Sequence, residues 1–224
     1  KEYYSIGLDD GKVFVYKGDS SNHYLSMDKV YEGIVHGDRV MGVGLDPFDL
    51  RLYTCSTDRT FYAIDLTNAK FPRVLVKISD SGYTNMELES SKRRIFLTNQ
   101  SGEITIFSIK TFPPNLVKRL KTSSHSTIRA FHINYPTNYI FIGDSNGRIC
   151  TFDLPKEDKE RLMSEISHFG VGQQKIRVCV CDPINFQLIT GDQNGKGTIW
   201  DLKKGKPIYL WVAHPKSVIT QIWY

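Results

Sequence analysis

The chain has 224 residues, of which 29 are basic and 24 acidic; its formal net charge is +5, and 40% of its residues are hydrophobic. This balance is typical of a folded globular protein and excludes an intrinsically disordered chain. No run approaches the ~18 consecutive apolar residues of a membrane-spanning helix, and the small, scattered basic excess is too weak to indicate nucleic-acid binding by itself.

Four cysteines, Cys55, Cys150, Cys179 and Cys181, lie in apolar runs and lack the spacing of a secreted disulfide framework. We therefore expect buried free thiols and a reducing, cytoplasmic compartment. Cys179 and Cys181 would need two further ligands to form a structural zinc site, and none is nearby, so no metal is expected. The chain begins with Lys1 rather than Met, and we expect it to be a piece of a longer protein.

A repeat of about 45 residues runs through the chain. Each copy ends in two apolar runs joined by a polar turn such as Asp10-Gly11 or Asn194-Gly195. Such pairs tolerate positive φ, so each copy predicts a β-hairpin, and two further apolar runs precede it. The hairpins occupy residues 3–16, 52–66, 95–109, 139–154 and 187–202.

Four antiparallel strands in each repeat predict an all-β propeller, in which four-stranded blades stack around an axis. The closing runs, Ile208–Val212 and Val218–Trp223, would supply half a blade. We expect one propeller domain over 1–224, about five blades' worth, in a ring that closes at five or, as we favour, at about seven blades. The expected parts are a half-blade at 3–16, blades at about 25–66, 74–109, 116–154 and 160–202, and a half-blade at 207–224.

The charged segment 155–167 allows two structures. Pro155 followed by Glu157 suits the first turn of a short helix, because proline and acidic residues are favoured there. Alternatively, Leu162–Ile166 forms the outermost strand of its blade after a charged loop, and we favour this strand.

The sequence offers no catalytic or cofactor-binding motif. No serine lies in a G-x-S-x-G string and no glycine-rich phosphate loop is present, so we expect neither an enzyme nor a cofactor. The turns at 144–147 and 192–195 are similar to calcium loops but lack a suitably placed acidic ligand. The basic run Lys92-Arg93-Arg94 predicts a solvated hairpin loop.

The repeats resemble the WD-repeat family. Trp200-Asp201 is the one full Trp-Asp dipeptide, while Ile64-Asp65 and Phe152-Asp153 keep an apolar residue and the aspartate. In that family a His–Ser/Thr–Asp–Trp hydrogen-bond network knits each blade internally, so the resemblance implies structural roles. The matching positions are His36, Thr54, Asp58, His125, Thr190, Trp200 and Asp201. Because several network positions are replaced, we expect packing to hold the blades.

A closer resemblance is to the WD-repeat-and-FYVE-domain proteins. It is carried by SIGLDDG at 5–11, HGDRV at 36–40 and FIGDSNG at 141–147. In that group the FYVE module is a zinc-bound insert that reads phosphoinositides, which implies recruitment to endosomal membranes. The present sequence has no paired C-x-x-C strings and no basic string of the FYVE type, so the resemblance assigns lipid binding to no residue here.

The repeat places basic residues at one end of the blades, in the loop before the innermost strand and in the hairpin turn. We expect these residues to form a rim that receives an acidic segment of a partner protein, since arginine binds carboxylates through two hydrogen bonds. The alternative is a surface that only keeps the protein soluble. The rim residues are Arg39, Arg59, Arg148, Lys175, Lys196 and Lys216, with His125 and Gln173 beside them.

We therefore expect a non-enzymatic scaffold that mediates protein–protein interactions within a multiprotein assembly. Loops would carry recognition, and strands would supply rigidity. Two alternatives remain: an endosomal recruitment protein of the WD-repeat-and-FYVE type, and a structural subunit of a cytoskeletal or ciliary complex. No nucleic acid, small-molecule substrate or membrane insertion is expected.

Overall fold

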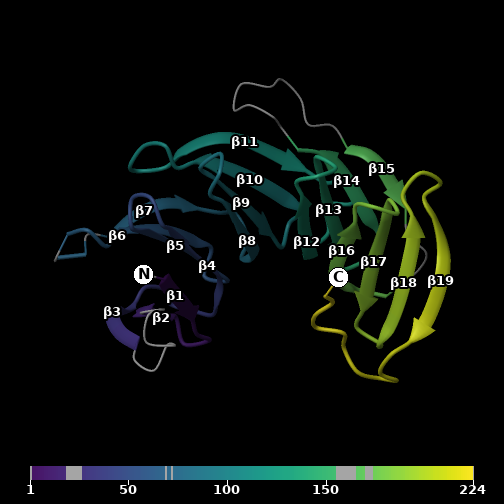
Figure 1. Cartoon of the computed structure of the whole chain (residues 1–224), viewed down its shortest axis with the longest axis horizontal. Coiled ribbons are helices and arrows are strands. Elements are labelled where there is room, and N and C mark those ends of the chain that lie inside the picture. Colours follow the sequence, from purple (N-terminus) through teal and green to yellow (C-terminus); the bar gives the residue numbers. More distant parts are fainter. Residues whose placement is uncertain are drawn as a thin grey trace. The chain divides into compact units, whose positions relative to one another are not determined.

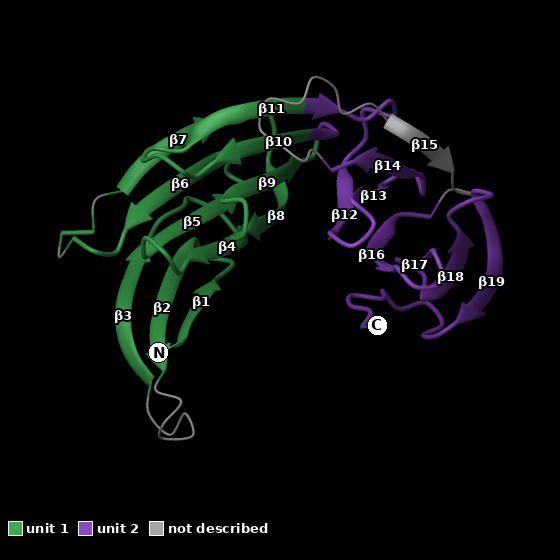
Figure 2. Cartoon of the chain, turned by 45° about the horizontal axis from the view of Figure 1, so that its top comes forward, with its two compact units in different colours: residues 1–100, 104–119 green, residues 101–103, 120–224 purple. Residues whose placement is uncertain are grey.

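The computed structural model describes residues 2–18, 27–68, 70–71, 73–154, 165–169 and 174–223. These residues form nineteen β-strands and no helix, which confirms the expected all-β class (Figure 1). The strands pair in five antiparallel sheets, and within each sheet every strand pairs with its neighbours in chain order. The chain divides into two compact units (Figure 2).

Unit 1 comprises residues 1–100 and 104–119. Its first sheet has three strands and the next two have four each. The strands are β1 (Glu2–Gly7), β2 (Lys12–Gly18) and β3 (Met27–Ile34); β4 (Val40–Asp46), β5 (Arg51–Ser56), β6 (Thr60–Asp65) and β7 (Arg73–Ile78); and β8 (Tyr83–Glu89), β9 (Arg94–Asn99), β10 (Glu103–Ser108) and β11 (Asn115–Lys121). The β9–β10 turn and the end of β11 belong to unit 2.

Unit 2 comprises residues 101–103 and 120–224 and contains two four-stranded sheets. The first consists of β12 (Ile128–Asn134), β13 (Tyr139–Asp144), β14 (Ile149–Asp153) and β15 (Glu165–Phe169). The second consists of β16 (Ile176–Asp182), β17 (Gln187–Asp192), β18 (Lys196–Asp201) and β19 (Lys206–Val212).

The cores lie between neighbouring sheets of the same unit, because the two central strands of each sheet alternate apolar side chains between both faces. In unit 1, Val13 and Val15 of the first sheet pack against Leu52 and Ile64 of the second. In unit 2, a corresponding cluster includes Phe141, Cys179 and Trp200. All four cysteines are buried free thiols, as the apolar context of each predicted.

The hairpin turns are tied to the loop that follows the outer strand. Gly11 and Gly195 adopt φ values of 80° and 82°, which only glycine adopts without strain. A Cβ at either position would also overlap the carbonyl oxygen of His36 or His214, respectively. The backbone N–H groups of His36 and His214 in turn donate to the carbonyl oxygens of these glycines (3.2 and 3.3 Å). Each glycine therefore holds the start of the next linker.

The sheets are displaced by one strand from the predicted repeats. The first strand of each repeat pairs with the last strand of the preceding hairpin, so β7 pairs with β6 and β19 with β18. The second sheet thus spans 40–78 rather than 25–66, and β3 gives the opening half-blade a third strand. Hydrogen bonds between strands determine which sheet an outer strand joins, and the repeat period in the sequence does not show this pairing.

The predicted final strand is not formed. Val218–Trp223 contains no strand, whereas Ile208–Val212 lies within β19. The segment has no neighbouring strand to pair with among residues 174–223. It is nevertheless held in place, because Ile219 N–H donates to the carbonyl oxygen of Asp192 (3.1 Å) and its side chain packs over Gly191.

The outer strand of the fourth sheet is β15, Glu165–Phe169, paired with β14. It overlaps the favoured strand at Leu162–Ile166 but begins three residues later. Residues 155–164 lie outside the described residues, so the helix alternative for that segment stays untested.

Candidate functional site

The most complete polar network lies in the β4–β7 sheet of unit 1 and brings three predicted residues together. His36 enters from the loop after β3 and is fully buried. Its Nδ1 lies 2.7 Å from Thr60 Oγ1, and its Nε2 lies 2.9 Å from Thr54 Oγ1. Asp58 accepts the backbone N–H of Gly37 (2.8 Å), which anchors the same loop to the β5–β6 turn.

The hydrogen bonds define the tautomer of His36. Thr60 donates its hydroxyl proton to Asp58 Oδ1 (2.5 Å), so Thr60 Oγ1 accepts from His36 Nδ1–H. His36 Nε2 then accepts the hydroxyl proton of Thr54. Burial lowers the pKa of His36, and the Asp58 carboxylate, 3.5 Å from Nδ1, opposes this shift. Since the Thr54 side chain is buried too, the network closes a loop onto a sheet rather than presenting a nucleophile.

In the β16–β19 sheet of unit 2 only part of this arrangement is present. Trp200 Nε1–H donates to Thr190 Oγ1 (2.8 Å), as the assigned roles predict. Asp201 does not join them, because its Oδ1 accepts the backbone N–H groups of Lys203 and Lys204 (2.9 and 3.1 Å) in the turn after β18. His125 also stays outside any such network: it is exposed in a turn with φ 49°.

The β8–β11 sheet carries a polar cluster that sequence reasoning missed. Thr84 Oγ1 and Thr98 Oγ1 lie 2.9 Å apart and are buried, and Asn85 Nδ2 donates to Thr98 (3.0 Å). Threonine is common in strands for steric reasons, so its presence gave no signal of a hydrogen-bond cluster. The cluster stabilises the inner strand of that sheet.

The run Lys92-Arg93-Arg94 is not the solvated loop that its charge predicted. The Arg94 side chain is 1% exposed, and its Nε donates to Glu89 Oε2 (2.8 Å), directly across the β8–β9 pair. Arg93 donates to Asp46 (2.9 Å) and also to Asp49. A buried guanidinium requires a carboxylate partner, and Glu89 opposite Arg94 in a hairpin was the available signal.

In unit 1, the structure places two predicted rim residues at the same end of the β4–β7 sheet. The N–H of Thr57, in the β5–β6 turn, donates to the carbonyl oxygen of Arg39, just before β4 (3.1 Å). The exposed Arg39 pairs with Asp9 (2.9 Å), and Arg59 is exposed with φ 74°. This end of unit 1 therefore carries charges of both signs.

In unit 2, four predicted rim residues lie at one end of two adjacent sheets. Arg148 ends the β13–β14 turn, Lys175 precedes β16 and Lys196 begins β18. Gln193 N–H donates to the carbonyl oxygen of Lys175 (3.1 Å), which joins the β17–β18 turn to the start of β16. The side chains of Arg148, Lys175, Lys196 and Lys216 are all exposed. Gln173 lies outside the described residues.

The carboxylates at this end of unit 2 are buried. Asp144 is 0% and Asp192 is 8% exposed. Each Oδ1 accepts two backbone N–H groups of its own hairpin turn, at 2.8 and 2.9 Å. Among the described residues, the charge that faces solvent here is therefore basic, unlike in unit 1.

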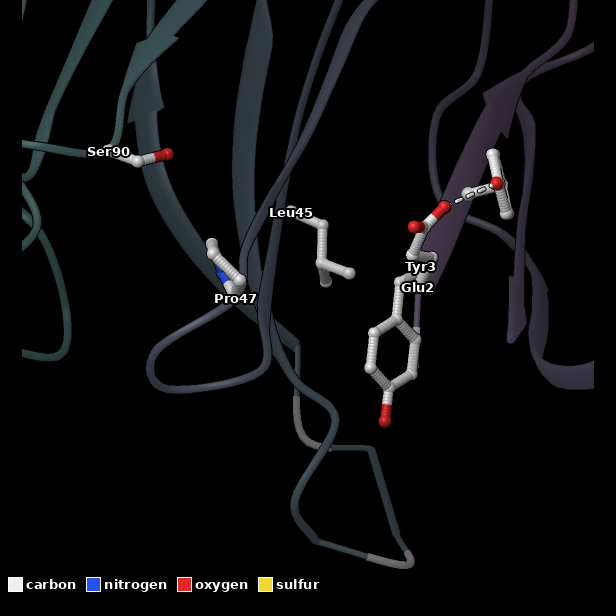
Figure 3. Close-up of a pocket in the computed structure, with 6 residues that line it drawn as sticks. Glu2, Tyr3, Leu45, Pro47 and Ser90 are labelled. Carbon is white, nitrogen blue, oxygen red and sulfur yellow. Dashed lines mark hydrogen bonds between the residues drawn. The ribbon is translucent and has the colours of Figure 1, made fainter. Parts of the chain in front are cut away.

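One pocket of about 410 Å³ lies in unit 1 beside β1 (Figure 3). It is lined by Tyr3, Leu45, Pro47 and Ser90, while Tyr4 donates its hydroxyl proton to Glu2 (2.8 Å). The lining mixes apolar and hydroxyl groups and holds one carboxylate, already engaged. Its described lining offers contact area but no paired groups for acid–base chemistry.

A second pocket, of about 250 Å³, lies within unit 2 at its basic end. Gly147 of the β13–β14 turn borders it on one side, and the remaining lining comes from the chain around the β16–β19 sheet. Its polar lining consists of Gln174, Thr190, Asp192, Lys196, Thr198 and Trp200. The pocket therefore adjoins the turn that carries Arg148.

Within the described ranges, no group of three or more His, Cys, Asp or Glu side chains is arranged to hold a metal ion. In the same part of the chain, none of the segments forms a helix long and apolar enough to cross a bilayer.

Comparison with known proteins gives one curated relative and many similar structures. The chain is 22% identical over 197 residues to WD repeat and FYVE domain-containing protein 2 of Caenorhabditis briggsae, covering 88% of this chain. It spans 44% of that relative's length. No family model matches the sequence.

Two solved structures share the fold. Sqt1 of Saccharomyces cerevisiae superposes with a TM-score of 0.77 and 15% identity, over 98% of this chain and 60% of its own. Sqt1 of Chaetomium thermophilum, bound to the N-terminus of the ribosomal protein L10, gives a TM-score of 0.75 and 16% identity, over 95% of this chain and 59% of its own. At these identities the likeness shows the fold alone.

Proposed function

Since the chain has the fold of a WD-repeat propeller, we propose that it is a non-enzymatic scaffold that binds other proteins within a multiprotein assembly. We further propose that the basic end of unit 2 holds an acidic segment of a partner. Rigid sheets that carry their turns and loops in fixed positions support such a role. The Sqt1 structure with a bound ribosomal-protein segment supports protein partners as a class.

The single observation that carries this proposal is the separation of charge at that end of unit 2. Arg148, Lys175, Lys196 and Lys216 are exposed, whereas Asp144 and Asp192 are buried and accept backbone N–H groups through Oδ1. An uncompensated basic surface attracts acidic segments over about 8–10 Å at physiological salt. The corresponding end of unit 1, where Arg39 pairs with Asp9, lacks this bias.

Crosslinking mass spectrometry on the full-length protein in its native assembly tests the proposal. We expect crosslinks to acid-rich partner segments from Lys175, Lys196 and Lys216. The matched control is the opposite end of the same sheet, where Lys203, Lys204 and Lys206 are exposed or nearly so. Partner crosslinks confined to these three control lysines would contradict the proposal.

A charge reversal tests the same surface without knowledge of the partner's structure. Arg148→Glu combined with Lys196→Glu should weaken capture of the crosslinked partner about tenfold or more, because like charges then face each other. Lys203→Glu combined with Lys206→Glu, at the other end, should leave capture unchanged.

A second candidate rests on the similarity to the WD-repeat-and-FYVE protein: membrane recruitment, with this chain as the propeller part. Here lipid contact would come from a FYVE module. Vesicles containing phosphatidylinositol 3-phosphate should then bind the full-length protein, and chelation of zinc should abolish this binding. Undiminished binding by residues 1–224 alone would contradict it.

A further inference from the structure

The pocket of about 250 Å³ in unit 2 occupies a position that is filled in unit 1. Thr190 pairs with Thr198 across β17 and β18, as Thr54 pairs with Tyr62 across β5 and β6. Lys196 likewise corresponds to Thr60, because both face the last residue of the outer strand. In unit 1, the imidazole of His36 lies between Thr54 and Thr60.

At the corresponding place in its sequence, unit 2 has a glycine, which lies outside the described residues. His36 stands three residues before Arg39, whereas the residue three before Lys175 is a glycine. Thr190 Oγ1 therefore has only the indole of Trp200 as a described partner, and it accepts from that indole. Its hydroxyl proton remains available to a further acceptor.

Apart from Asp192, each of the described polar side chains in the pocket can donate a hydrogen bond, although the Thr198 hydroxyl and the Gln174 amide can also accept one. Among the described residues, the side chains of Thr198 and Gln174 have no hydrogen-bond partner. Lys196 adds an ammonium group. The one carboxylate in the described lining is that of Asp192, and its Oδ1 accepts two backbone N–H groups. Two hydroxyls, one amide and one ammonium together favour a ligand that accepts several hydrogen bonds and carries negative charge.

We propose that this pocket binds the carboxylate of an aspartate or glutamate side chain in an acidic partner segment. The segment would lie along Arg148 and Lys175, with one carboxylate reaching Lys196 and Thr198. The inference rests on the proposed scaffold function and names the part of the basic surface that recognises the partner. The position that a histidine of the chain closes in unit 1 is thus filled by a partner's side chain in unit 2.

The probe is a fluorescent glutamate–glycine repeat peptide of eight residues, acetylated at its N-terminus and amidated at its C-terminus. Binding to residues 1–224 is measured by fluorescence anisotropy at low salt. The Lys196→Met, Thr198→Val double variant should bind about tenfold more weakly, because it removes two charge-assisted hydrogen bonds. The matched control, Lys206→Met at the other end of the same sheet, should bind as the parent does.

Thermal unfolding of each variant shows whether it is folded. If the double variant is unfolded, Thr198→Val alone is used instead, because valine preserves the shape of the threonine side chain. Equal affinity of parent and pocket variants would overturn the proposal. So would binding of a glutamine–glycine peptide with the same strength, since that ligand carries no charge. A glutamine–glycine peptide that binds only when its C-terminal carboxylate is free would show that the pocket takes a chain end instead.

The pocket assignment and the scaffold proposal are contradicted by different experimental results. If the pocket variants bind the peptide normally while partner crosslinks still arise at Lys175, Lys196 and Lys216, the pocket assignment is wrong and the scaffold proposal stands. If partner crosslinks arise only at the opposite end of the sheet, the proposed partner surface is wrong. If the native assembly gives no partner crosslinks at all, the scaffold proposal is wrong, whatever the peptide shows.

Discussion

The β4–β7 sheet of unit 1 and the β16–β19 sheet of unit 2 share one strand register but use one position in opposite ways. In the first, His36 joins Thr54, Thr60 and Asp58 in a closed network. In the second, Trp200 donates a hydrogen bond to Thr190, and hydroxyl, amide and ammonium groups line a pocket.

The difference shows how one scaffold separates stability from recognition. Buried polar groups are costly when unpaired, so a position closed by the chain itself contributes to folding. The same position left with free donors next to exposed basic residues can contribute to binding instead. The predictions below test each half of this comparison.

The largest effect is expected for His36→Ala. The substitution leaves the Thr54 and Thr60 hydroxyls without their buried partner and opens a cavity, which should lower the free energy of unfolding by about 3 kcal/mol. Urea denaturation measures it. His214→Ala is the control, because His214 follows β19 at the same loop position but is exposed. It should change stability by less than about 0.5 kcal/mol. Equal losses in both variants would contradict a network specific to unit 1.

Trp200→Phe tests the corresponding bond in unit 2. The ring is kept and the N–H is lost, so we expect a loss of about 1–2 kcal/mol in urea denaturation. Adding Thr190→Val should then cost little more, because its partner is already gone. Fully additive losses would show that Trp200 and Thr190 act independently.

The pH dependence of stability tests the burial of His36 in the β4–β7 sheet. Burial lowers the pKa of folded His36, so in mildly acidic solution the unfolded chain binds a proton that the folded chain does not. Stability is therefore present above the unfolded pKa of about 6.5 and decreases as pH falls below it. The slope from this group is at most about 1.4 kcal/mol per pH unit. Melting curves at several pH values should show a shallower dependence for His36→Gln, and an unchanged slope would contradict this reasoning.

The smallest effect is expected at the mixed-charge end of unit 1. Arg39 and Asp9 form an exposed ion pair, which contributes little because water screens it. Arg39→Ala should shift the free energy of unfolding by less than about 0.5 kcal/mol in thermal or urea denaturation. A larger loss would mean that this end is structurally more constrained than its exposure indicates.

Much of the fold could be predicted because each hairpin has a recognisable turn in the sequence. Turns such as Asp10-Gly11 and Asn194-Gly195 lie between alternating apolar runs, and both glycines have the positive φ that those turns require. Which outer strand belongs to which sheet could not be predicted, since β7 has the same pattern whichever neighbour it pairs with. Val218–Trp223 has the composition of a strand, but a strand exists only with a partner.

The candidate site was only partly predictable for a related reason. His36, Thr54 and Asp58 were assigned by position in the repeat, and the structure brings them together. His125 matched by residue type but lies exposed, because a loop that differs in length moves a side chain out of register. The pocket beside Trp200 has no signature in the sequence, because its lining comes from residues that no motif joins.

The one-strand displacement between repeats and sheets has a practical consequence for dissecting this protein. A fragment that ends at a repeat boundary such as residue 109 or 154 would lack the outermost strand of its last sheet. The edge of β10 or β14 would then have no strand paired with it. Bare edges invite association between molecules. Truncations that follow β7 or β11 keep every remaining strand paired, but a cut after β7 also uncovers Tyr53 and Phe61, which pack against Ile95 of the next sheet. Of these two cuts, the one after β11 is therefore expected to give the fragment that associates less during purification.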